Sequence, residues 1–556
     1  MTDPRLDLHD IQGNIIKAYG RFGFPKGRYV FFGVEDAVAG REFVAELCSS
    51  ITTSTPFRER ALPEVTTNIA FTYHGLRELG VPRASLQTFP DEFAMGMRAR
   101  RDILGDEGTS APERWDPIWR QPDRVHIMIA ISGQDDRGLE LRYQQIAEIA
   151  QRTRGVRLLR GHRGPGGADD LEYQPATAIY DNGQPTAKEH FGYVDGIGDP
   201  FFKGTGAHES NVLGGGKPTG LPPDTLFGWA PLETGEFLLG YRDEAHECPE
   251  APSPRLLSYN GTFMAYRKLH QNVAAFDGYL EHVGLEFPGG KEALAAKFTG
   301  RWRNGAPLSK FPTQRDADEF AQRWLQAKNA VVQAKSRADR ETAKEHFAEL
   351  NKQFVAFDYR SDLSGGRCPM GAHIRRANPR SALEFDQLLA FEDPGALSNR
   401  RRIIRRGLPY GDSKASRTDD GDHGIIFMAL NASLRRQFEF VQQQWMNYGN
   451  DFRLANERDA LVGNHPPEGG SMVVQTEPDD PRPPFFCNRL PRFVETRGGD
   501  YFFIPSMTAL RMIGGIILIV LGLNLAGLIH VPVLERTWRP LETGAATSLA
   551  SATGSV

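Results

Sequence analysis

The sequence of 556 residues is poor in cysteine and has no excess of charge of either sign. Its four cysteines lie far apart, and no CxxC, CxxCH or HExxH motif occurs. These absences argue against a disulfide framework, a cofactor attached through a CxxCH motif and a zinc-protease helix. Scattered free thiols fit a reducing compartment. Lys and Arg number 66 and Asp and Glu number 70, so the formal charge of −4 gives the chain no general electrostatic reason to bind nucleic acid.

The first ten residues lack the apolar core and the twin arginine of a secretion signal, which favours a cytoplasmic location. In contrast, residues 512–534 contain no Asp, Glu, Lys or Arg. As a helix they would rise about 34 Å, enough for a bilayer core of roughly 30 Å. Two interpretations stay open for 512–534, a membrane anchor and a buried C-terminal helix. Residues 535–556 form a polar tail.

Apolar runs and helix-like segments alternate in two similar stretches. The first has the order strand, helix, strand, strand, helix, strand, which is typical of a ferredoxin-like unit. The second repeats this order with long insertions, although one strand is not evident. We therefore predict an α+β fold of duplicated ferredoxin-like domains, with antiparallel sheets covered by helices. The predicted strands are 28–34, 68–73, 125–132, 156–160, 262–268, 424–430 and 501–504, and the predicted helices are 37–50, 138–153, 272–283 and 433–448.

The predicted domains are 1–203 and 232–511, joined by the Gly/Pro-rich connection 204–231. In that connection the sequence GGGKPTG has Pro218 where a phosphate-binding Walker A motif has Ser or Thr, and no apolar strand leads into it. A flexible loop is therefore favoured over a phosphate loop. Residues 316–353 are rich in Ala, Gln, Glu, Lys and Arg with few helix breakers, which predicts an exposed helical insertion in the second domain.

One histidine stands out by its setting. His373 lies in CPMGAHIRRANPR, where small residues would let a flat ligand approach closely and arginines are placed to meet carboxylates. This pattern suits an axial ligand of haem iron with the haem propionates near the arginines. An ordinary core or surface histidine is the alternative on the residues alone.

Two further motifs carry charged residues. Asp195 lies between glycines in HFGYVDGIGDP, where a tight turn could aim its carboxylate into a cavity, while an Asx turn is the ordinary alternative. Residues 400–406 include five arginines, and the apolar pair Ile403 and Ile404 among them indicates a partly buried strand. Nucleic-acid contact, a site for peroxide and haem propionates, and a solvated loop remain open for this run.

Taken in this order, the three motifs resemble those of the dye-decolourising peroxidases, in the larger group that lacks a signal peptide. The resemblance covers roughly residues 8–511, and the sequence departs from the family after Met512. The family's opening motif is matched by DIQGNI at 10–15, its GxxDG motif by Gly192, Asp195 and Gly196, its proximal-histidine motif by 368–380 and its distal-arginine motif by 400–411.

The resemblance implies a peroxidase with one haem b per chain, bound in the C-terminal half. Such an enzyme reduces hydrogen peroxide through an oxoferryl intermediate and oxidises dyes, phenols or other one-electron donors. His373 would be the proximal ligand of the iron, and Asp195 and Arg405 the catalytic pair on the distal side. Arg405 is preferred to Arg406 because it lies two residues before Gly407, as the distal arginine of the family does.

The resemblance gives less specific expectations for the rest of the site. Ile425 and Phe427, at alternating positions of one strand, would cover the distal pocket. Arg375 is a candidate for a haem propionate. Glu384 and Asp386 are guesses for the carboxylate that orients His373.

Peroxide cleavage requires a proton to move from one oxygen to the other, a task for Asp195, while Arg405 would stabilise negative charge on the departing oxygen. The main alternative is a haem-binding or haem-handling protein with little peroxidase turnover, which would need His373 but not the other two residues. An RNA-binding protein is disfavoured because the arginine run lacks interleaved aromatics. The expected partners are hydrogen peroxide and a reducing substrate, with no nucleic acid. Membrane contact through 512–534 and an oligomer stay open.

Overall fold

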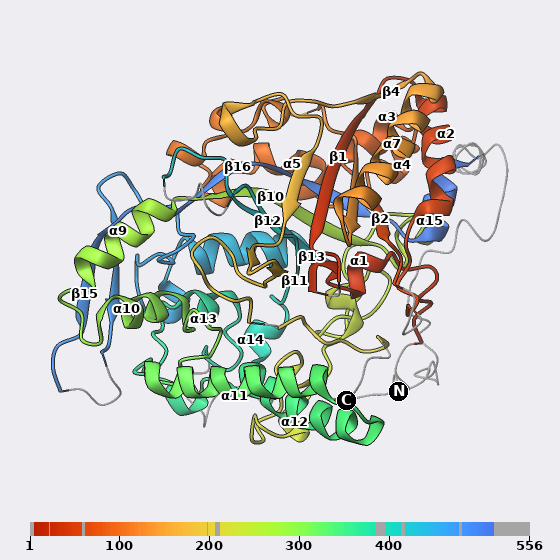
Figure 1. Cartoon of the computed structure of the whole chain (residues 1–556). Helices are drawn as coiled ribbons and strands as arrows, with labels where there is room; N and C mark the ends of the chain where they lie inside the picture. Colours follow the sequence, from red (N-terminus) through yellow and green to blue (C-terminus); the bar gives the residue numbers. More distant parts are fainter. Residues whose placement is uncertain are drawn as a thin grey trace, which may run out of the picture.

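The structure, a computed structural model, describes residues 5–21, 23–57, 62–121, 123–196, 198–205, 212–383, 395–412, 418–476 and 481–515 (Figure 1). A long antiparallel sheet runs through the molecule, with helices packed around it. The path of hydrogen-bonded strands is β11-β13-β10-β16-β2-β3-β1-β4, with β5 paired to β1 and β12 paired to β13.

The N-terminal half of the sheet has the strand order β2-β3-β1-β4. This is the order expected of a ferredoxin-like unit, in which the first and third strands are central neighbours. Both helices of the unit begin at an aspartate whose carboxylate accepts a backbone N–H, Asp36 from Ala39 and Asp135 from Gly138. The elements are β1 (Lys26–Val34), α2 (Ala37–Leu47), β2 (Val65–Phe71), β3 (Ile127–Gly133), α7 (Asp136–Thr153) and β4 (Val156–Leu158).

The C-terminal half repeats that order as β11-β13-β10-β16. The strand missing from the predicted order of the second unit is β11, which lies inside the arginine run, where Ile403 and Ile404 had indicated a partly buried strand. The second helix of the unit, after β13, has π-helical hydrogen bonding in the structure, in two consecutive segments, η11 and η12. The elements are β10 (Thr262–Gln271), α9 (Val273–Val283), β11 (Ile404–Arg406), β13 (Gly424–Asn431), η11 (Arg435–Glu439), η12 (Val441–Met446) and β16 (Val494–Ile504).

The two halves form one sheet because β16 also pairs with β2, through Phe503 and Phe71. Aromatic rings from both halves pack together at this junction. The ring of Phe31 lies 5.5 Å from that of Tyr266 and 6.2 Å from that of Phe502. The prediction of an α+β fold built from duplicated ferredoxin-like units is confirmed.

The remaining elements cover this framework or extend from it (Figure 1). The helices are α1 (Gly13–Ile16), α3 (Tyr73–Glu78), α4 (Arg83–Leu86), α5 (Asp91–Ala99), α6 (Arg101–Leu104), α8 (Arg255–Ser258), α10 (Gly290–Thr299), α11 (Gln314–Gln333), α12 (Arg337–Val355), α13 (His373–Ala377), α14 (Ala396–Asn399) and α15 (Met507–Gly514). The strands are β5 (Gln174–Thr177), β6 (Tyr180–Asp181), β7 (Gln184–Pro185), β8 (Lys217–Pro218), β9 (Trp229–Ala230), β12 (Pro409–Tyr410), β14 (Gly470–Val474) and β15 (Phe485–Leu490).

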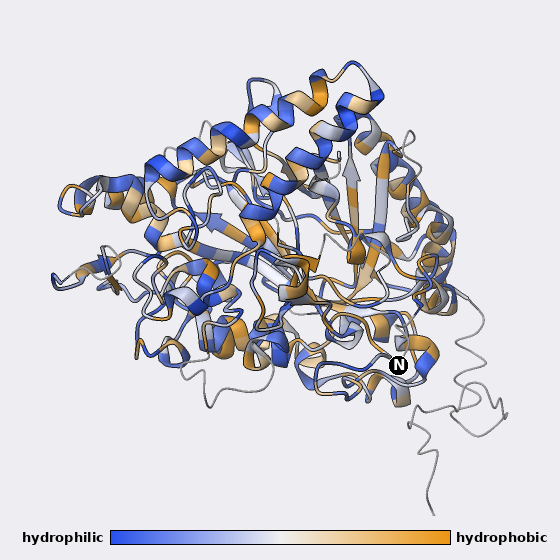
Figure 2. Ribbon diagram, turned by 90° about the horizontal axis from the view of Figure 1, so that it is seen from below, coloured by the Kyte–Doolittle hydropathy of each residue, from blue (hydrophilic) through white to orange (hydrophobic). Residues whose placement is uncertain are grey.

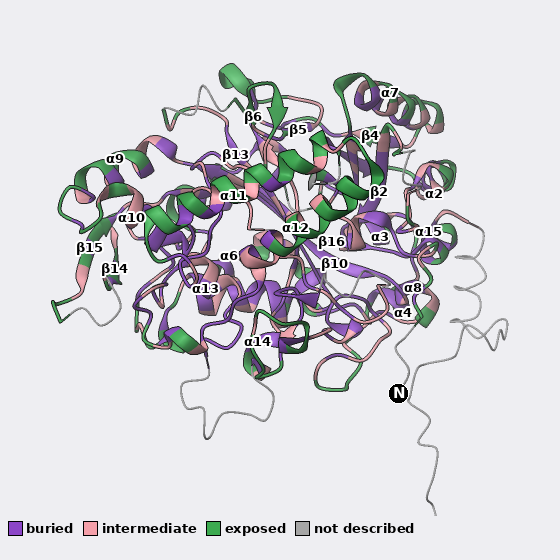
Figure 3. Ribbon diagram, turned by 60° about the horizontal axis from the view of Figure 1, so that its bottom comes forward, coloured by how far each residue is buried: buried purple, intermediate pink, exposed green. Residues whose placement is uncertain are grey.

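Helices α11 and α12 pack against each other as a hairpin at the surface. Their outer faces are hydrophilic and exposed (Figures 2 and 3). Inner residues such as Phe320 and Phe354 are buried, with their rings 4.8 Å apart. The charges of this region therefore form a solvated face, and its apolar stripe attaches it to the second half.

The start of the uncharged segment 512–534 belongs to the core. Met512 and Ile513, on α15, are buried, and a Cβ at Gly514 would lie only 2.9 Å from the backbone nitrogen of Ala45 on α2. A membrane span beginning at Met512 is therefore wrong, because α15 packs too closely on α2. Residues 516–534 lie outside the described residues. Within the described part of the chain, no helix has the length and apolar character needed to cross a membrane.

Candidate functional site

Arg405 and Asp195 are 210 residues apart in the sequence and form an ion pair in the structure. The Arg405 Nη2 atom lies 3.1 Å from the Asp195 Oδ1 atom. Strand β11 carries Arg405, and the loop of the GxxDG motif carries Asp195. Much of both side chains is accessible, 46% for Arg405 and 35% for Asp195.

The charge of Asp195 raises the pKa of Arg405, and burial acts in the opposite direction. Arg405 is thus desolvated by surrounding protein although nearly half of its side chain is accessible. The guanidinium is therefore accessible to a small molecule although neighbouring protein partly desolvates it. Arg405 remains a cation there because its ordinary pKa is already high.

Arg406 points to the other side of β11, as neighbouring residues of a strand do. Its guanidinium lies 2.9 Å from Asp199 Oδ2 and donates to the carbonyl oxygens of Asn14 and Ile15 at 2.6 and 3.0 Å. Arg406 therefore ties the N-terminal segment to β11. This placement agrees with the preference for Arg405 as the residue of the site.

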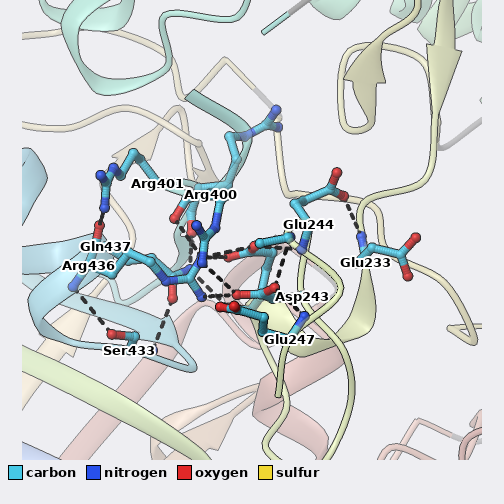
Figure 4. Close-up of polar contacts among 12 residues, drawn as sticks. Glu233, Asp243, Glu244, Glu247, Arg400, Arg401, Ser433, Arg436 and Gln437 are labelled. Carbon is cyan, nitrogen blue, oxygen red and sulfur yellow. Dashed lines mark hydrogen bonds and ion pairs between the residues drawn. The ribbon is translucent and has the colours of Figure 1, made fainter. Parts of the chain in front are cut away.

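The other arginines of the run have partners within the protein, and Figure 4 shows Arg400 and Arg401 among their polar contacts. Arg400 pairs with Asp243 at 3.0 Å, and Arg401 lies 3.8 Å from the centroid of the Phe440 ring. Arg402 is buried and donates to the carbonyl oxygens of Gly215 and Gly216. These contacts remove the reason to read the run as a nucleic-acid surface.

Ile425 and Phe427 share a face of the sheet with Arg405. Arg405 pairs directly with Ala429 across β11 and β13, and directly paired residues point to the same face. Because side chains alternate along β13, Phe427 and Ile425 point to that face as well. Both are partly exposed, whereas Ile426 between them is fully buried. Their predicted position beside Arg405 agrees with this register.

The loop that carries Asp195 is fixed by the partly buried carboxylate of Glu189. Glu189 accepts the backbone N–H groups of Phe191 and Tyr193, each at 2.9 Å. Burial raises the pKa of Glu189. Gly192, between the two donors, has φ +91°, a value that favours glycine. The glycine of the GxxDG pattern thus serves the turn that presents Asp195.

His373 is the first residue of α13, and its ring is oriented by Asp459. The Nδ1 atom of His373 lies 3.0 Å from Asp459 Oδ2. Asp459 is fully buried, and its Oδ1 accepts the N–H groups of Leu461 and Val462, each at 2.9 Å. Burial alone would raise the pKa of Asp459. The charge of His373 and its hydrogen bond, with a further contribution from Arg376, reverse this and lower that pKa.

A buried aspartate at Nδ1 fixes the tautomer of His373, because Nδ1 then carries the proton and Nε2 keeps its lone pair. The Nε2 atom has no hydrogen-bond partner among the described residues, and 30% of the side chain is accessible. This arrangement suits a ligand of a metal ion. No sequence motif identified Asp459 as the partner of His373, because it lies 86 residues downstream. Glu384 and Asp386, the guessed partners, lie outside the described residues.

Arg375 has a different role from the predicted one. It is fully buried, and its guanidinium donates to the carbonyl oxygens of Asp362 and Cys368, both at 2.8 Å, and to Asp362 Oδ2 at 3.3 Å. Asp362 already supplies a carboxylate to this guanidinium, so the structure gives no reason to place a haem propionate there. Arg375 instead fastens the chain before His373, since the small residues around it leave a buried space that the guanidinium fills.

A single turn touches both motifs of the site. Gly300 has φ +89°, and a Cβ there would lie 2.5 Å from Cγ1 of Ile374, the residue after His373. The next residue, Arg301, packs on Gly196, the residue after Asp195, where a Cβ would lie 2.5 Å from the guanidinium carbon. Gly300 and Arg301 follow each other in the chain, so one short segment contacts both the part that carries His373 and the part that carries Asp195.

Comparison with known proteins assigns this arrangement to a family. The family model described as "DyP dimeric alpha+beta barrel domain" matches residues 10–163, and the model described as "Dyp-type peroxidase, C-terminal" matches residues 343–472. Together the two models match just over half of the chain.

Curated relatives align along nearly the whole chain. Peroxidase 2 of Mycetinis scorodonius is 28% identical over 91% of this chain and 87% of its own length. The dye-decolorizing peroxidase of Mycena epipterygia is 28% identical over 92% of this chain and 88% of its own. Among solved structures, an ancestral D-type dye decolorizing peroxidase is 27% identical, with a TM-score of 0.66, over 91% of this chain and 99% of that one. The chain therefore belongs to the dye-decolourising peroxidase family and is a peroxidase.

Proposed function

We propose that this peroxidase binds haem b, one per chain, with His373 as the iron ligand, and that Asp195 and Arg405 act on hydrogen peroxide. The observation that carries the proposal is the ion pair of 3.1 Å between Asp195 and Arg405, which two distant segments build beside an accessible space. A haem-binding protein without peroxidase turnover would have no use for this pair.

The residues fit a haem group by their chemistry. His373 offers a neutral Nε2, which is the donor that haem iron takes from a proximal histidine. Arg380, the last residue of the histidine motif, is buried, and among the described residues its guanidinium donates to the backbone carbonyl oxygens of Val355, Phe357 and Gly214. Burial lowers its pKa to about 9.

Arg380 has no carboxylate within ion-pair distance in the part of the chain that the structure describes. Buried cations are normally compensated by anions. We assign to Arg380, in place of Arg375, the role of meeting a haem propionate. Ile425 and Phe427 would provide apolar surface on the side of Arg405.

When bound, haem supplies an iron centre that takes up the two oxidising equivalents of peroxide and returns them one at a time to reducing substrates. The protein residues handle protons and charge. Asp195 accepts the proton from one peroxide oxygen and delivers it to the other, directly or through water. Arg405 stabilises the negative charge that develops on the departing oxygen. Dyes and phenols are the reducing substrates that the family membership favours.

The absorption spectrum of the purified protein tests the function directly. A haem band should be present, should change on adding one equivalent of peroxide, and should return when a one-electron donor such as a phenol is added. A haem band that peroxide leaves unchanged would instead favour the haem-handling alternative.

Asp459→Asn is expected to weaken haem binding without unfolding the protein. The amide keeps the size of the side chain but removes the negative charge that makes His373 a strong donor. Mutating a residue that hydrogen-bonds to a metal ligand typically lowers metal affinity about 10–100-fold. Loss of the negative charge should also raise the reduction potential of the iron. Haem titration of the apoprotein and potentiometry measure both effects. Asp451→Asn, whose carboxylate accepts only the Trp445 indole N–H, is the control. Unchanged affinity and potential in Asp459→Asn would contradict the role.

Two predictions from the sequence stay proposals: contact of 512–534 with a membrane, of which the structure describes 512–515, and a cytoplasmic location of the enzyme. Cell extracts with the full chain and with a chain ending at Gly515, which keeps α15, test them. If 516–534 are an anchor, only the full chain should sediment with membranes in detergent-free, high-salt buffer. If neither chain sediments with membranes, the anchor is ruled out.

A further inference from the structure

The turn at residues 300–307, which contacts both motifs of the site, is rigid. Trp302 and Ala306 are joined by a backbone hydrogen bond of 3.0 Å, and Gly305 donates to the Trp302 carbonyl oxygen at 2.8 Å. Arg301 and Pro307 form an isolated β-bridge at its base. The turn therefore holds its side chains in fixed directions.

The same turn holds the loop of Asp195. The backbone N–H of Val194 donates to the carbonyl oxygen of Arg303 at 3.0 Å, and Arg303 Nη1 donates back to the carbonyl oxygen of Phe191. The guanidinium carbon of Arg303 also lies 5.3 Å from the centre of the Tyr193 ring. Residues on both sides of Gly192 are thus attached to one turn.

Arg301 presents a positive charge to this loop. Its Nη1 donates to the carbonyl oxygens of Gly305 and Phe354 at 2.8 and 2.9 Å. Its Nε and Nη2 atoms lie against Gly196, at 2.5 and 2.8 Å from the place of a Cβ there. These two atoms have no hydrogen-bond acceptor among the described residues, although the side chain is buried. A larger residue than glycine at position 196 would displace the guanidinium.

The charges around Arg301 identify its electrostatic partner. Burial lowers the pKa of Arg301 to about 10, while Tyr359 and then Asp195 act to raise it and Arg405 acts to lower it. Cys368 also acts to raise the pKa of Arg301. The charge of Arg301 in turn lowers the pKa of the buried Arg380. Asp195 is the carboxylate among these groups, so two cations act on it, Arg405 on β11 and Arg301 on the turn. Asp199 is the further carboxylate that acts on Arg405.

We propose that Arg301 is a positioning residue for the peroxide reaction, which packs on Gly196 and supplies the second positive charge that keeps Asp195 ionised. This inference rests on the proposed role of Asp195 as the proton acceptor. Arg405 meets the carboxylate directly, whereas Arg301 packs on the next residue of the loop, Gly196. A purely structural Arg301 would only satisfy the carbonyl oxygens of Gly305 and Phe354.

The test is the pH dependence of the second-order reaction of the haem-loaded enzyme with peroxide. A nearby opposite charge lowers the pKa of a carboxyl group, by roughly 1–3 units at 4–6 Å and by less at a greater distance. Arg301→Gln should therefore move the acidic limb of the rate to higher pH, by about one unit. At a fixed pH below the limb, the rate should fall about tenfold. Arg301→Lys, which keeps the charge, should leave the limb near its wild-type position.

A second readout does not depend on turnover. Fluoride binding to the ferric iron weakens as a nearby carboxylate ionises, because the two negative charges repel. In Arg301→Gln, the pH at which fluoride affinity falls should rise by the same amount as the acidic limb. Arg142→Gln is the matched control, because Arg142 is a partly buried arginine on α7 that donates to Ser50 and Thr67.

Gly196→Ala keeps the experiment decisive if Arg301→Gln does not fold. The added methyl group pushes the guanidinium away from the loop without removing it, so the limb should again move to higher pH. An unmoved limb in a variant with normal haem content, whether Arg301→Gln or Gly196→Ala, overturns the proposal. Asp195→Asn with a wild-type rate at every pH would overturn the proposed role of Asp195 itself, which is a separate result.

Discussion

His373→Ala is expected to yield a folded protein that retains little or no haem. The side chain supplies a donor atom that is oriented for a metal by the hydrogen bond of 3.0 Å to Asp459. Removing a hydrogen-bond partner of a metal ligand lowers metal affinity about 10–100-fold, so removing the ligand itself should lower it further. The ratio of haem to protein after gel filtration measures the loss. Circular dichroism tests whether the fold is kept.

A control and a rescue sharpen this experiment. His346→Ala removes an exposed histidine of α12 and should leave haem content unchanged. Added imidazole should restore part of the haem binding of His373→Ala, because the small ligand can fill the space left by the ring. Full haem occupancy with an unaltered spectrum in His373→Ala would disprove the assignment of His373.

Arg405→Leu is expected to slow the reaction with peroxide by about 10²–10³, with haem binding little changed. Leucine keeps apolar bulk but cannot stabilise the negative charge on the departing oxygen, and one such donor contributes roughly 2.7–4 kcal/mol to the barrier. Asp195→Asn should also slow the reaction, to a smaller extent if Arg405 or water substitutes. Stopped-flow measurement at increasing peroxide concentrations gives the second-order rate constants.

The neighbouring residue offers a matched control. Arg406→Leu removes an equally charged side chain from the same strand, but one that holds Asp199 and the N-terminal segment. It should lower the melting temperature and leave the peroxide rate within a few-fold of wild type. If Arg406→Leu lost the rate and Arg405→Leu kept it, the assignment of the two arginines would be reversed.

The sequence predicted the parts of the fold that local pattern determines. Strands such as 28–34 and 424–430 are apolar over most of their length, and both ferredoxin-like units could be inferred from their order. A strand was indicated at β11, but it could not be assigned to the second unit because only three residues form it and two of them are arginines. Its partial burial, inferred from Ile403 and Ile404, agrees with the buried Ile404 of the structure.

The site could be predicted only where a motif was continuous. Asp195, Arg405 and His373 each stand in a recognisable stretch of sequence, and the first two meet as expected. Asp459 could not be found, because its contact with His373 depends on how the chain returns after η12. Arg375 was predicted to meet a haem propionate but contacts Asp362 and Cys368, since an arginine near a histidine can face either a ligand or the backbone.

The position of β16 has a consequence for synthesis of the protein. This strand is the last of the sheet in the sequence but lies between β10 and β2, where it links the two halves. About 230 residues separate the end of β10 from the end of β16, which takes about 10–50 s to translate at roughly 5–20 residues per second. During that interval one edge of β10 is uncovered and must be kept from pairing with other chains. The residues proposed to hold haem, and Asp459 behind them, all emerge before the strand that closes the sheet.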